Sequence, residues 1–175
     1  MSVALIVGRM MPVHKGHTFM ISKAIEDNET VIVCPGSVQE SGTIRNPWTF
    51  EQRKTMLKNI YGDRIKIVPL KDIGSNSSTN DWCNYVLEKL QKLGMPEPDT
   101  YIGGSEADVI WYKKTFNPEN NKKTVIYNRM DNVYPSGSDI RTYLQTNNFT
   151  WKQYVPKVNH EYIMSTFPSS LILET

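Results

Sequence analysis

The chain has 175 residues, enough for one domain that buries about 70% of the surface of its unfolded form. Its hydrophobic fraction of 39% and charged fraction of 22% are those of an ordinary globular protein. A net charge of +2 produces no long-range field that would attract a nucleic-acid polymer, so we expect no such partner.

The chain also has few of the features that direct a protein to a membrane or out of the cell. Its two cysteines are far apart in sequence and form no disulfide framework, which favours a reducing compartment. The first apolar run begins at the third residue and leaves no room for a signal peptide. No apolar run approaches the ~20 residues that span a bilayer. We therefore expect a cytoplasmic protein without a membrane partner.

Strand-like and helix-like segments alternate along the chain. Short apolar runs predict five strands, at residues 3–7, 30–33, 65–68, 100–102 and 124–127. Apolar positions at helical spacing predict helices after residue 17, from Thr49 onwards, and at 81–93, 106–116, 138–145 and 156–164. This alternation predicts an α/β fold, a single Rossmann-like domain with a five-stranded parallel sheet and helices on both faces. Ligands of such sheets bind beyond the carboxyl ends of the strands.

Residues 1–165 are assigned to this domain, and residues 166–175 to a C-terminal tail. The tail ends in an apolar run, Leu171-Ile172-Leu173. Such a run is a candidate surface for self-association, so a homo-oligomer is possible.

The most informative motif joins the first predicted strand to the first predicted helix: His14-Lys15-Gly16-His17. At this junction, backbone N–H groups and the positive end of the helix dipole attract an anion, and Gly16 lets a bulky ligand approach the backbone. His14 and His17 can point the same way and donate hydrogen bonds to phosphate oxygens. The motif indicates a triphosphate site, and the alternative is a pair of structural histidines in a turn.

Other phosphate and metal motifs do not fit this segment. It has neither the Gly-x-x-x-x-Gly-Lys-Ser/Thr of a Walker A loop nor the Gly-x-Gly-x-x-Gly of a dinucleotide fingerprint. Beyond the histidine pair, only Cys34, Cys83 and His160 offer soft ligands, and none stands at a spacing typical of zinc. We therefore predict no protein-ligated metal.

His-x-Gly-His after a first strand resembles the nucleotidyltransferase superfamily, whose members join a nucleoside monophosphate to a phosphate and release pyrophosphate. Class I aminoacyl-tRNA synthetases carry a related signature, but this chain lacks a Lys-Met-Ser-Lys-Ser loop and room for tRNA-binding parts. The resemblance implies that His14 and His17 hold ATP phosphates, with His17 closest to the transferring group. It further implies that Gly8 and Arg9 provide backbone contacts.

The polar segment 36–53 follows the second predicted strand and indicates which family within the superfamily the chain resembles. It resembles the second motif of archaeal-type nicotinamide mononucleotide (NMN) adenylyltransferases, which runs Gly-Ser-x-Gln-x-Ser, a basic residue, Asn/Asp-Pro-x-Thr and a Glu-Arg pair. Here Gln52 replaces the Glu and Gly42 replaces a usual His. The basic residue is Arg45, and the resemblance places it near the reacting centre, where it neutralises phosphate charge.

A third motif is Ser136-Gly137-Ser138-Asp139-Ile140-Arg141. Hydroxyls and N–H groups at a helix start, with an arginine further along the same face, form a second anion clamp. The alternative is a plain N-cap with a solvated arginine. The motif resembles the superfamily's Ser-x-Ser/Thr-x-x-Arg signature, which implies that Ser136, Gly137, Ser138 and Arg141 hold the β- and γ-phosphates of ATP. Arg129 falls near a basic position of the same family and is a weaker candidate.

The middle of the chain concerns the acceptor. The segments 69–73 and 81–84 resemble the NMN-binding region of archaeal-type and NadR-type enzymes, which implies that Asp72 helps to bind NMN and that Trp82 stacks on the nicotinamide ring. A cationic pyridinium suits an indole face. Core packing of Trp82 is the alternative. The segment 105–108 departs from the archaeal pattern and resembles the NadR-type domain.

These resemblances imply an enzyme that transfers the adenylyl group of ATP to NMN, giving NAD and pyrophosphate. Catalysis is then expected from His14, His17, Arg45 and Arg141, with Mg²⁺ bridging phosphate oxygens and keeping several waters. Two alternatives stay open. One is adenylyl or cytidylyl transfer to another phosphorylated acceptor, such as phosphopantetheine or FMN. The other is a catalytically silent nucleotide-binding module.

Overall fold

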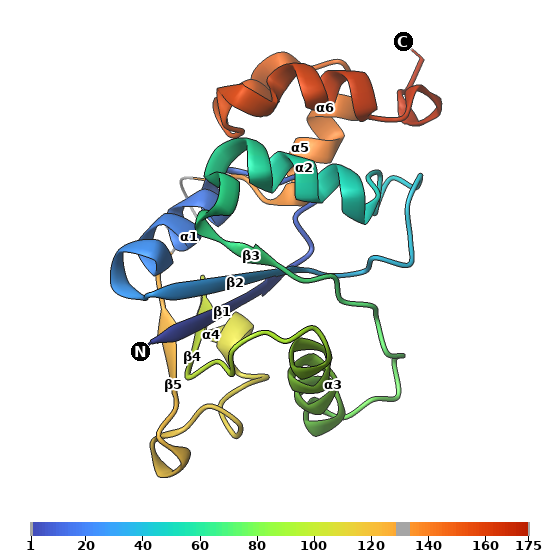
Figure 1. The fold of residues 1–175 in the computed structure, drawn as a ribbon. Coiled ribbons are helices and arrows are strands. Elements are labelled where there is room, and N and C mark those ends of the chain that lie inside the picture. Colours follow the sequence, from blue (N-terminus) through green and yellow to red (C-terminus); the bar gives the residue numbers. More distant parts are fainter. Residues whose placement is uncertain (1, 129–133, 175) are drawn as a thin grey trace.

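The computed structural model describes residues 2–128 and 134–174 and has the expected α/β fold (Figure 1). Its parallel sheet has five strands in the order β3-β2-β1-β4-β5. These are β1 (Val3–Gly8), β2 (Thr30–Pro35), β3 (Lys66–Ile67), β4 (Thr100–Gly103) and β5 (Lys123–Ile126). The predicted fold class is confirmed.

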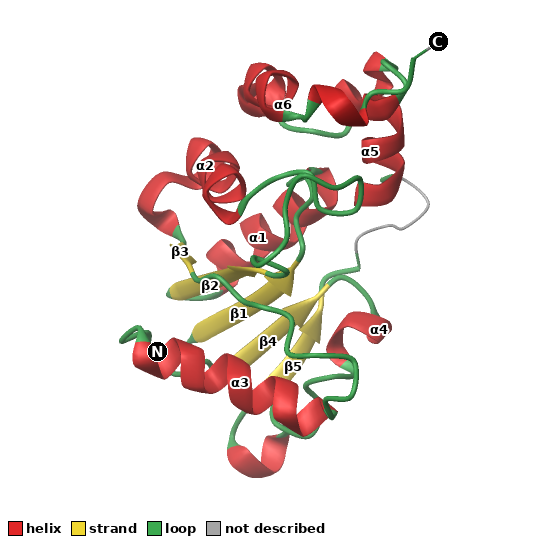
Figure 2. Cartoon of the chain, turned by 90° about the vertical axis from the view of Figure 1, so that its right-hand side faces the viewer, coloured by secondary structure: helices red, strands yellow, loops and turns green. Residues whose placement is uncertain are grey.

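Helices cover both faces of the sheet (Figure 2). They are α1 (Lys15–Asp27), α2 (Phe50–Tyr61), α3 (Thr79–Lys92), α4 (Glu106–Val109), α5 (Gly137–Gln145) and α6 (His160–Thr166). Side chains of β1 alternate between the two faces, as the period of a strand requires. Ala4 and Ile6 join a core with α1, α2, α5 and α6, whereas Val3 and Leu5 join a second core with α3 and α4.

The strand order places a switch point beside β1. β1 pairs with β2 on one side, with Gly8 opposite Pro35, and with β4 on the other, with Ala4 opposite Thr100. From β1 the chain adds β2 and β3 on one side of the sheet and then β4 and β5 on the other. The loops that follow β1 and β4 therefore run in opposite directions from the carboxyl ends of these strands. In open parallel sheets this is where ligands bind.

The helix predicted at 106–116 is wrong in extent, because α4 ends at Val109 and residues 110–115 form turns. Buried Val109, Tyr112 and Phe116 stand at helical spacing, which explains the prediction. The run Val-Ile-Trp-Tyr at 109–112 has a modest helix propensity. Tertiary packing decides its conformation: the Tyr112 ring stacks on Tyr101 with a centroid distance of 3.7 Å.

Other boundaries shift by a few residues. α3 begins at Thr79 instead of 81, because Ser78 and Asp81 form a reciprocal capping box before it. The helix predicted at 156–164 is a short 3-10 turn, Lys157–Asn159, followed by α6.

Several residues between 166 and 172 pack against the domain. The boundary expected there falls inside α6, and the Trp48 indole donates to the Thr166 hydroxyl at 2.9 Å. Phe167 is buried, and Leu171 and Ile172 pack against the same core. These side chains therefore have partners within the chain, whereas Leu173 is exposed. None of the helices that the structure describes has the length and apolar character needed to cross a bilayer.

Candidate functional site

His14 and His17 form the turn between β1 and α1. The Nδ1 atom of His14 accepts from the Gly16 N–H at 3.0 Å and caps the helix, while the Nδ1 atom of His17 accepts from the His14 N–H at 3.3 Å. The two rings lie 4.0 Å apart, centroid to centroid, and both are buried. Because Nδ1 accepts in each ring, the neutral imidazole carries its proton on Nε2. Each ring is thus set to donate from Nε2.

Gly8 ends β1 directly beside His17. A Cβ atom added to Gly8 would lie 3.8 Å from the His17 Nε2 atom and 3.6 Å from the Met10 Cε atom. These are ordinary van der Waals distances, so an alanine would fit, whereas a larger side chain would crowd the His17 Nε2 atom.

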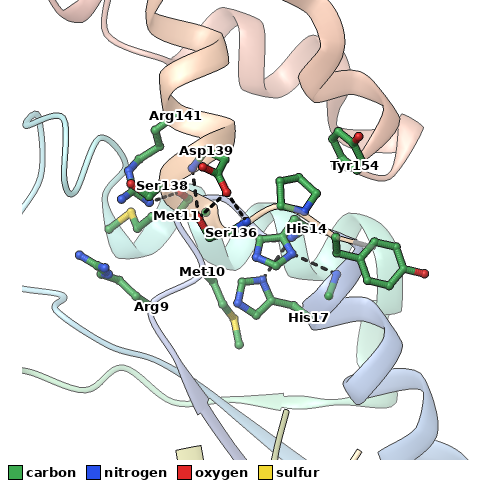
Figure 3. A pocket seen from close by; sticks show the side chains of 14 residues that line it. Arg9, Met10, Met11, His14, His17, Ser136, Ser138, Asp139, Arg141 and Tyr154 are labelled. Atoms are coloured by element: carbon green, nitrogen blue, oxygen red, sulfur yellow. Dashed lines mark hydrogen bonds between the residues drawn. The ribbon is translucent and has the colours of Figure 1, made fainter. Parts of the chain in front are cut away.

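The first cavity, of about 660 Å³, lies between the N-termini of α1 and α5 (Figure 3). The sequence-predicted residues on its wall are Arg9, His14, His17, Ser136, Gly137, Ser138 and Arg141, joined by Met10, Met11, Gly16, Tyr134, Pro135, Asp139 and Tyr154. Two helix N-termini with their outward N–H groups thus face one space. The first and third motifs, more than a hundred residues apart, therefore line one cavity, as an anion site built from both would require.

Gly137 and Arg141 fix the position of α5 against the loop after β1. The Arg141 Nη1 atom donates to the Met11 carbonyl at 2.8 Å. A Cβ atom on Gly137 would lie 3.1 Å from that Nη1 atom and 3.3 Å from the Met11 oxygen, so the close approach favours glycine. Ser136 is engaged with Asp139, whose Oδ2 atom accepts from the Ser136 N–H at 2.9 Å and from its hydroxyl at 2.8 Å.

Arg9, Arg45 and Arg141 come together from three separate segments. They line a smaller cavity of about 350 Å³, named the third cavity below, together with Ile44, Ser138 and Thr142. Burial lowers the pKa of Arg141, and the guanidinium groups of Arg9 and Arg45 lower it further. Burial and then Arg45 likewise lower the pKa of Arg9, whose Nη1 atom is buried without a hydrogen-bond partner among the described residues. A bound anion would relieve this repulsion.

The second cavity, of about 860 Å³, lies beyond the carboxyl ends of β1, β2, β3 and β4. Arg9 lines both it and the first cavity, so the two spaces meet at this side chain. Of the sequence-predicted residues, Gly8, Arg9, Arg45, Asp72 and Trp82 lie on its wall. The structure therefore places Asp72 and Trp82, the two residues expected to bind the acceptor, on one cavity wall next to the first cavity.

Asp72 and Trp82 are each held by neighbouring side chains. Asp72 accepts from the Ser37 hydroxyl at 3.0 Å and from the Gln39 amide at 2.7 Å, which ties the loop after β3 to the loop after β2. The Trp82 indole N–H donates to the Tyr112 hydroxyl at 2.6 Å. Trp82 is half-buried and packs against the second core, yet it also lines the cavity. Its position is therefore compatible with core packing and with a contact to a ligand in the cavity.

Sequence reasoning missed several residues of the second cavity. Trp111, Tyr112 and Asp108 reach it because α4 ends early, and Trp111 keeps 48% of its surface exposed. Glu40 and Asn46 also line it, with the Asn46 Nδ2 atom donating to Glu40 Oε2 at 2.6 Å. The length of α4 and the fold of the 36–49 loop are set by tertiary contacts, so no local signal could place these side chains.

Two further points concern Arg129 and the side chains that could hold a metal ion. Arg129, the weaker phosphate candidate, lies outside the described residues. Within residues 2–128 and 134–174, no three His, Cys, Asp or Glu side chains form a group able to hold a metal ion.

Comparison with known proteins identifies the family. The cytidylyltransferase-like family matches residues 5–143 of the chain. The nicotinamide-nucleotide adenylyltransferase of Methanococcus aeolicus is 31% identical over 156 residues, covering 87% of this chain and 83% of the relative. The enzyme of the same name from Saccharolobus solfataricus is 31% identical over 170 residues, covering 94% and 91%.

Solved structures share the fold. A bifunctional NMN adenylyltransferase/ADP ribose pyrophosphatase from Francisella tularensis has a TM-score of 0.76 and 24% identity. The match covers 94% of this chain and 50% of that one, so this chain spans half the length of the Francisella protein. A second structure of that bifunctional enzyme, complexed with AMP and a manganese ion, has a TM-score of 0.65.

Proposed function

Because the chain belongs to the cytidylyltransferase-like family, and within it to the nicotinamide-nucleotide adenylyltransferases, we propose that it transfers the adenylyl group of ATP to NMN, giving NAD and pyrophosphate. One observation carries the assignment to these side chains. The anion site of His14, His17 and Arg141 opens at Arg9 into the cavity that holds Asp72 and Trp82. A triphosphate and a mononucleotide can therefore meet at one guanidinium.

The triphosphate occupies the first cavity in this proposal. The Nε2–H groups of His14 and His17 donate to phosphate oxygens near the transferring group. Arg141 holds the β- and γ-phosphates together with the N–H groups of Gly137 and Ser138 at the start of α5. Ser136 supports these contacts through its capping box with Asp139.

The reaction is an in-line displacement at the α-phosphorus. An oxygen of the NMN phosphate forms the new P–O bond, and the bond from the α-phosphorus to the bridging oxygen breaks as pyrophosphate leaves. A phosphate monoester is already ionised at neutral pH, with a second pKa of about 6, so no side chain has to remove a proton. Positioning and charge stabilisation by His17, Arg9 and Arg45 therefore provide the catalysis.

The acceptor occupies the second cavity. The half-buried indole of Trp82 offers an electron-rich face to the cationic nicotinamide ring, which favours stacking. Its N–H bond to Tyr112 fixes the plane of that face. Asp72 helps to bind the nucleotide from the loop after β3, where the Ser37 hydroxyl of the loop after β2 holds its carboxylate.

Mg²⁺ accompanies the triphosphate in this proposal. The first cavity fits an ion that arrives with ATP, since the carboxylate on its wall, Asp139, is engaged with Ser136. Such an ion would be held by phosphate oxygens and water, and it neutralises charge on the leaving pyrophosphate. A cytoplasmic location and a homo-oligomer stay predictions.

A coupled assay tests the function against both alternatives. The purified chain with Mg²⁺, ATP and NMN should produce NAD and pyrophosphate in equal amounts. Turnover with phosphopantetheine or FMN, and none with NMN, would reassign the acceptor. ATP binding without turnover on any of the three would instead support a silent nucleotide-binding module.

A further inference from the structure

Arg53 is a fully buried cation behind the wall of the second cavity. It belongs to α2, and its side chain has 0% of its surface exposed. Its Nη1 atom donates to the Arg9 carbonyl at 2.7 Å and to the Gly36 carbonyl at 2.6 Å. Its Nε atom donates to the Thr49 carbonyl at 3.3 Å. One guanidinium therefore binds three separate stretches of backbone.

The two Nη1 contacts join the strand ends that form the site. Arg9 directly follows β1 and Gly36 directly follows β2, and both line the second cavity. The Gly36 N–H also donates to the Gly8 carbonyl at 3.0 Å. Arg53 thus holds the carboxyl ends of β1 and β2 together next to Arg9, where the first and second cavities meet.

The buried charge of Arg53 is unusual for a residue with a purely structural role. Burial lowers the pKa of Arg53 to about 10, and the neighbouring Arg9 guanidinium contributes to that fall, so the side chain stays charged at neutral pH. Its Nη2 atom is buried without a hydrogen-bond partner among the described residues. A buried cation beside a second cation is costly for stability alone. It does add positive potential where anions are expected.

We infer that Arg53 is a positioning residue for adenylyl transfer. Its guanidinium holds the Arg9 and Gly36 carbonyls together and so fixes the Arg9 side chain between the triphosphate and the acceptor phosphate. The inference rests on the proposed function. It assigns Arg53 no contact with substrate.

Two substitutions test this role. Arg53→Met removes the charge and every donor, and we expect kcat for NAD formation to fall by about 10²-fold, the loss that a misplacement near 1 Å causes. Arg53→Lys keeps the charge but loses the planar fork, so its kcat should lie between those of Arg53→Met and the wild type. In both variants kcat should change more than KM for ATP or NMN, because Arg53 touches neither substrate.

Arg64→Met is the matched control. Arg64 also donates to two backbone carbonyls, those of Tyr61 and Ile60, at 3.2 Å each, but it lies in the 3-10 turn after α2 and is exposed. Its loss should leave kcat unchanged. All rates are measured well below each variant's Tm, so that lowered stability alone does not reduce kcat.

The outcomes separate this inference from the proposed function. Wild-type kcat in a folded Arg53→Lys or Arg53→Met overturns the inference, as does an equal loss in Arg64→Met. If Arg53→Met does not fold, Arg53→Lys decides. If the wild type makes no NAD, calorimetry with inorganic pyrophosphate replaces the rate assay, because an Arg9 side chain displaced by the loss of Arg53 would bind this anion less well in the first cavity. Weaker binding by Arg53→Lys than by the wild type then supports the role, and equal binding overturns it.

Discussion

The first and second cavities meet at Arg9, yet they are built from different kinds of contact. The first is assembled from two helix starts, each organised by residues within three positions of one another: His14 with His17, and Ser136 with Asp139. The second is assembled from loops after four strands, joined by long-range contacts such as Asp72 to Ser37. A cavity whose wall is made of helix caps should lose function when a single side chain is replaced. A cavity whose wall is made of loops joined by long-range contacts should lose less function with any one replacement, because many residues share the work.

The largest expected effect comes from His17→Ala. If the His17 Nε2–H group stabilises charge in the transition state, kcat should fall by about 10²–10³-fold, as when one oxyanion donor is removed. Measurement of kcat at saturating ATP and NMN tests this.

The same change removes the acceptor of the His14 N–H, so the free energy of unfolding should fall by about 1 kcal/mol. His160→Ala is the control, since that ring bonds the Val155 carbonyl and packs on Trp151, on the C-terminal side of the fold. A folded His17→Ala with wild-type kcat would remove His17 from the catalytic group.

Arg141→Ala should have the next largest effect. A charge-assisted hydrogen bond contributes about 1.5–3 kcal/mol, so its loss should weaken ATP and pyrophosphate binding by about 10- to 150-fold. AMP lacks the distal phosphates and should bind almost as before. Calorimetry with the three ligands tests the difference.

Arg45→Ala tests whether Arg45 acts at the reacting centre, in contrast to the role expected for Arg141 at the distal phosphates. Arg45 lines both the second and the third cavity and comes from the loop after β2. Its loss should lower kcat more than ATP affinity. Equal weakening of ATP, pyrophosphate and AMP in Arg141→Ala would place Arg141 away from the distal phosphates.

The same division explains what the sequence could predict. Strand alternation and capping boxes are local signals, and the fold, the His14–His17 turn and the start of α5 follow from them. The early end of α4 does not, because stacking of Tyr112 on Tyr101 outweighs the helical spacing of its apolar residues. That contact brings Trp111 to the second cavity. Arg53 is a further case, since its three carbonyl partners come together only in the folded chain.

Trp82→Ala tests the second cavity and should have a smaller effect. Loss of stacking and cation–π attraction is expected to cost about 0.5–2 kcal/mol, which is about 2- to 30-fold in NMN affinity, with little change for ATP. Quenching of indole fluorescence by NMN should also be smaller in Trp82→Phe, which lacks the indole at this position. Trp111→Ala shows how much of the quench comes from the second tryptophan on this wall. Wild-type NMN affinity in a folded Trp82→Ala would mean that the indole only packs the core.

The smallest expected effect compares the helix caps that support the two cavities. Ser78 begins α3, which carries Trp82, and Ser136 begins α5, and each hydroxyl accepts from the N–H of an aspartate three residues later. Replacing either serine with alanine should lower the free energy of unfolding by about 1 kcal/mol, measured by urea titration. The two variants should differ in binding. Ser136→Ala disturbs N–H groups at the start of α5, on the wall of the first cavity, and should weaken pyrophosphate binding. Ser78→Ala lies at the edge of the tied loops and should leave pyrophosphate binding unchanged. Equal pyrophosphate affinity in both variants would show that the start of α5 does not hold the phosphates, and the contrast between a capped and a tied cavity would fail.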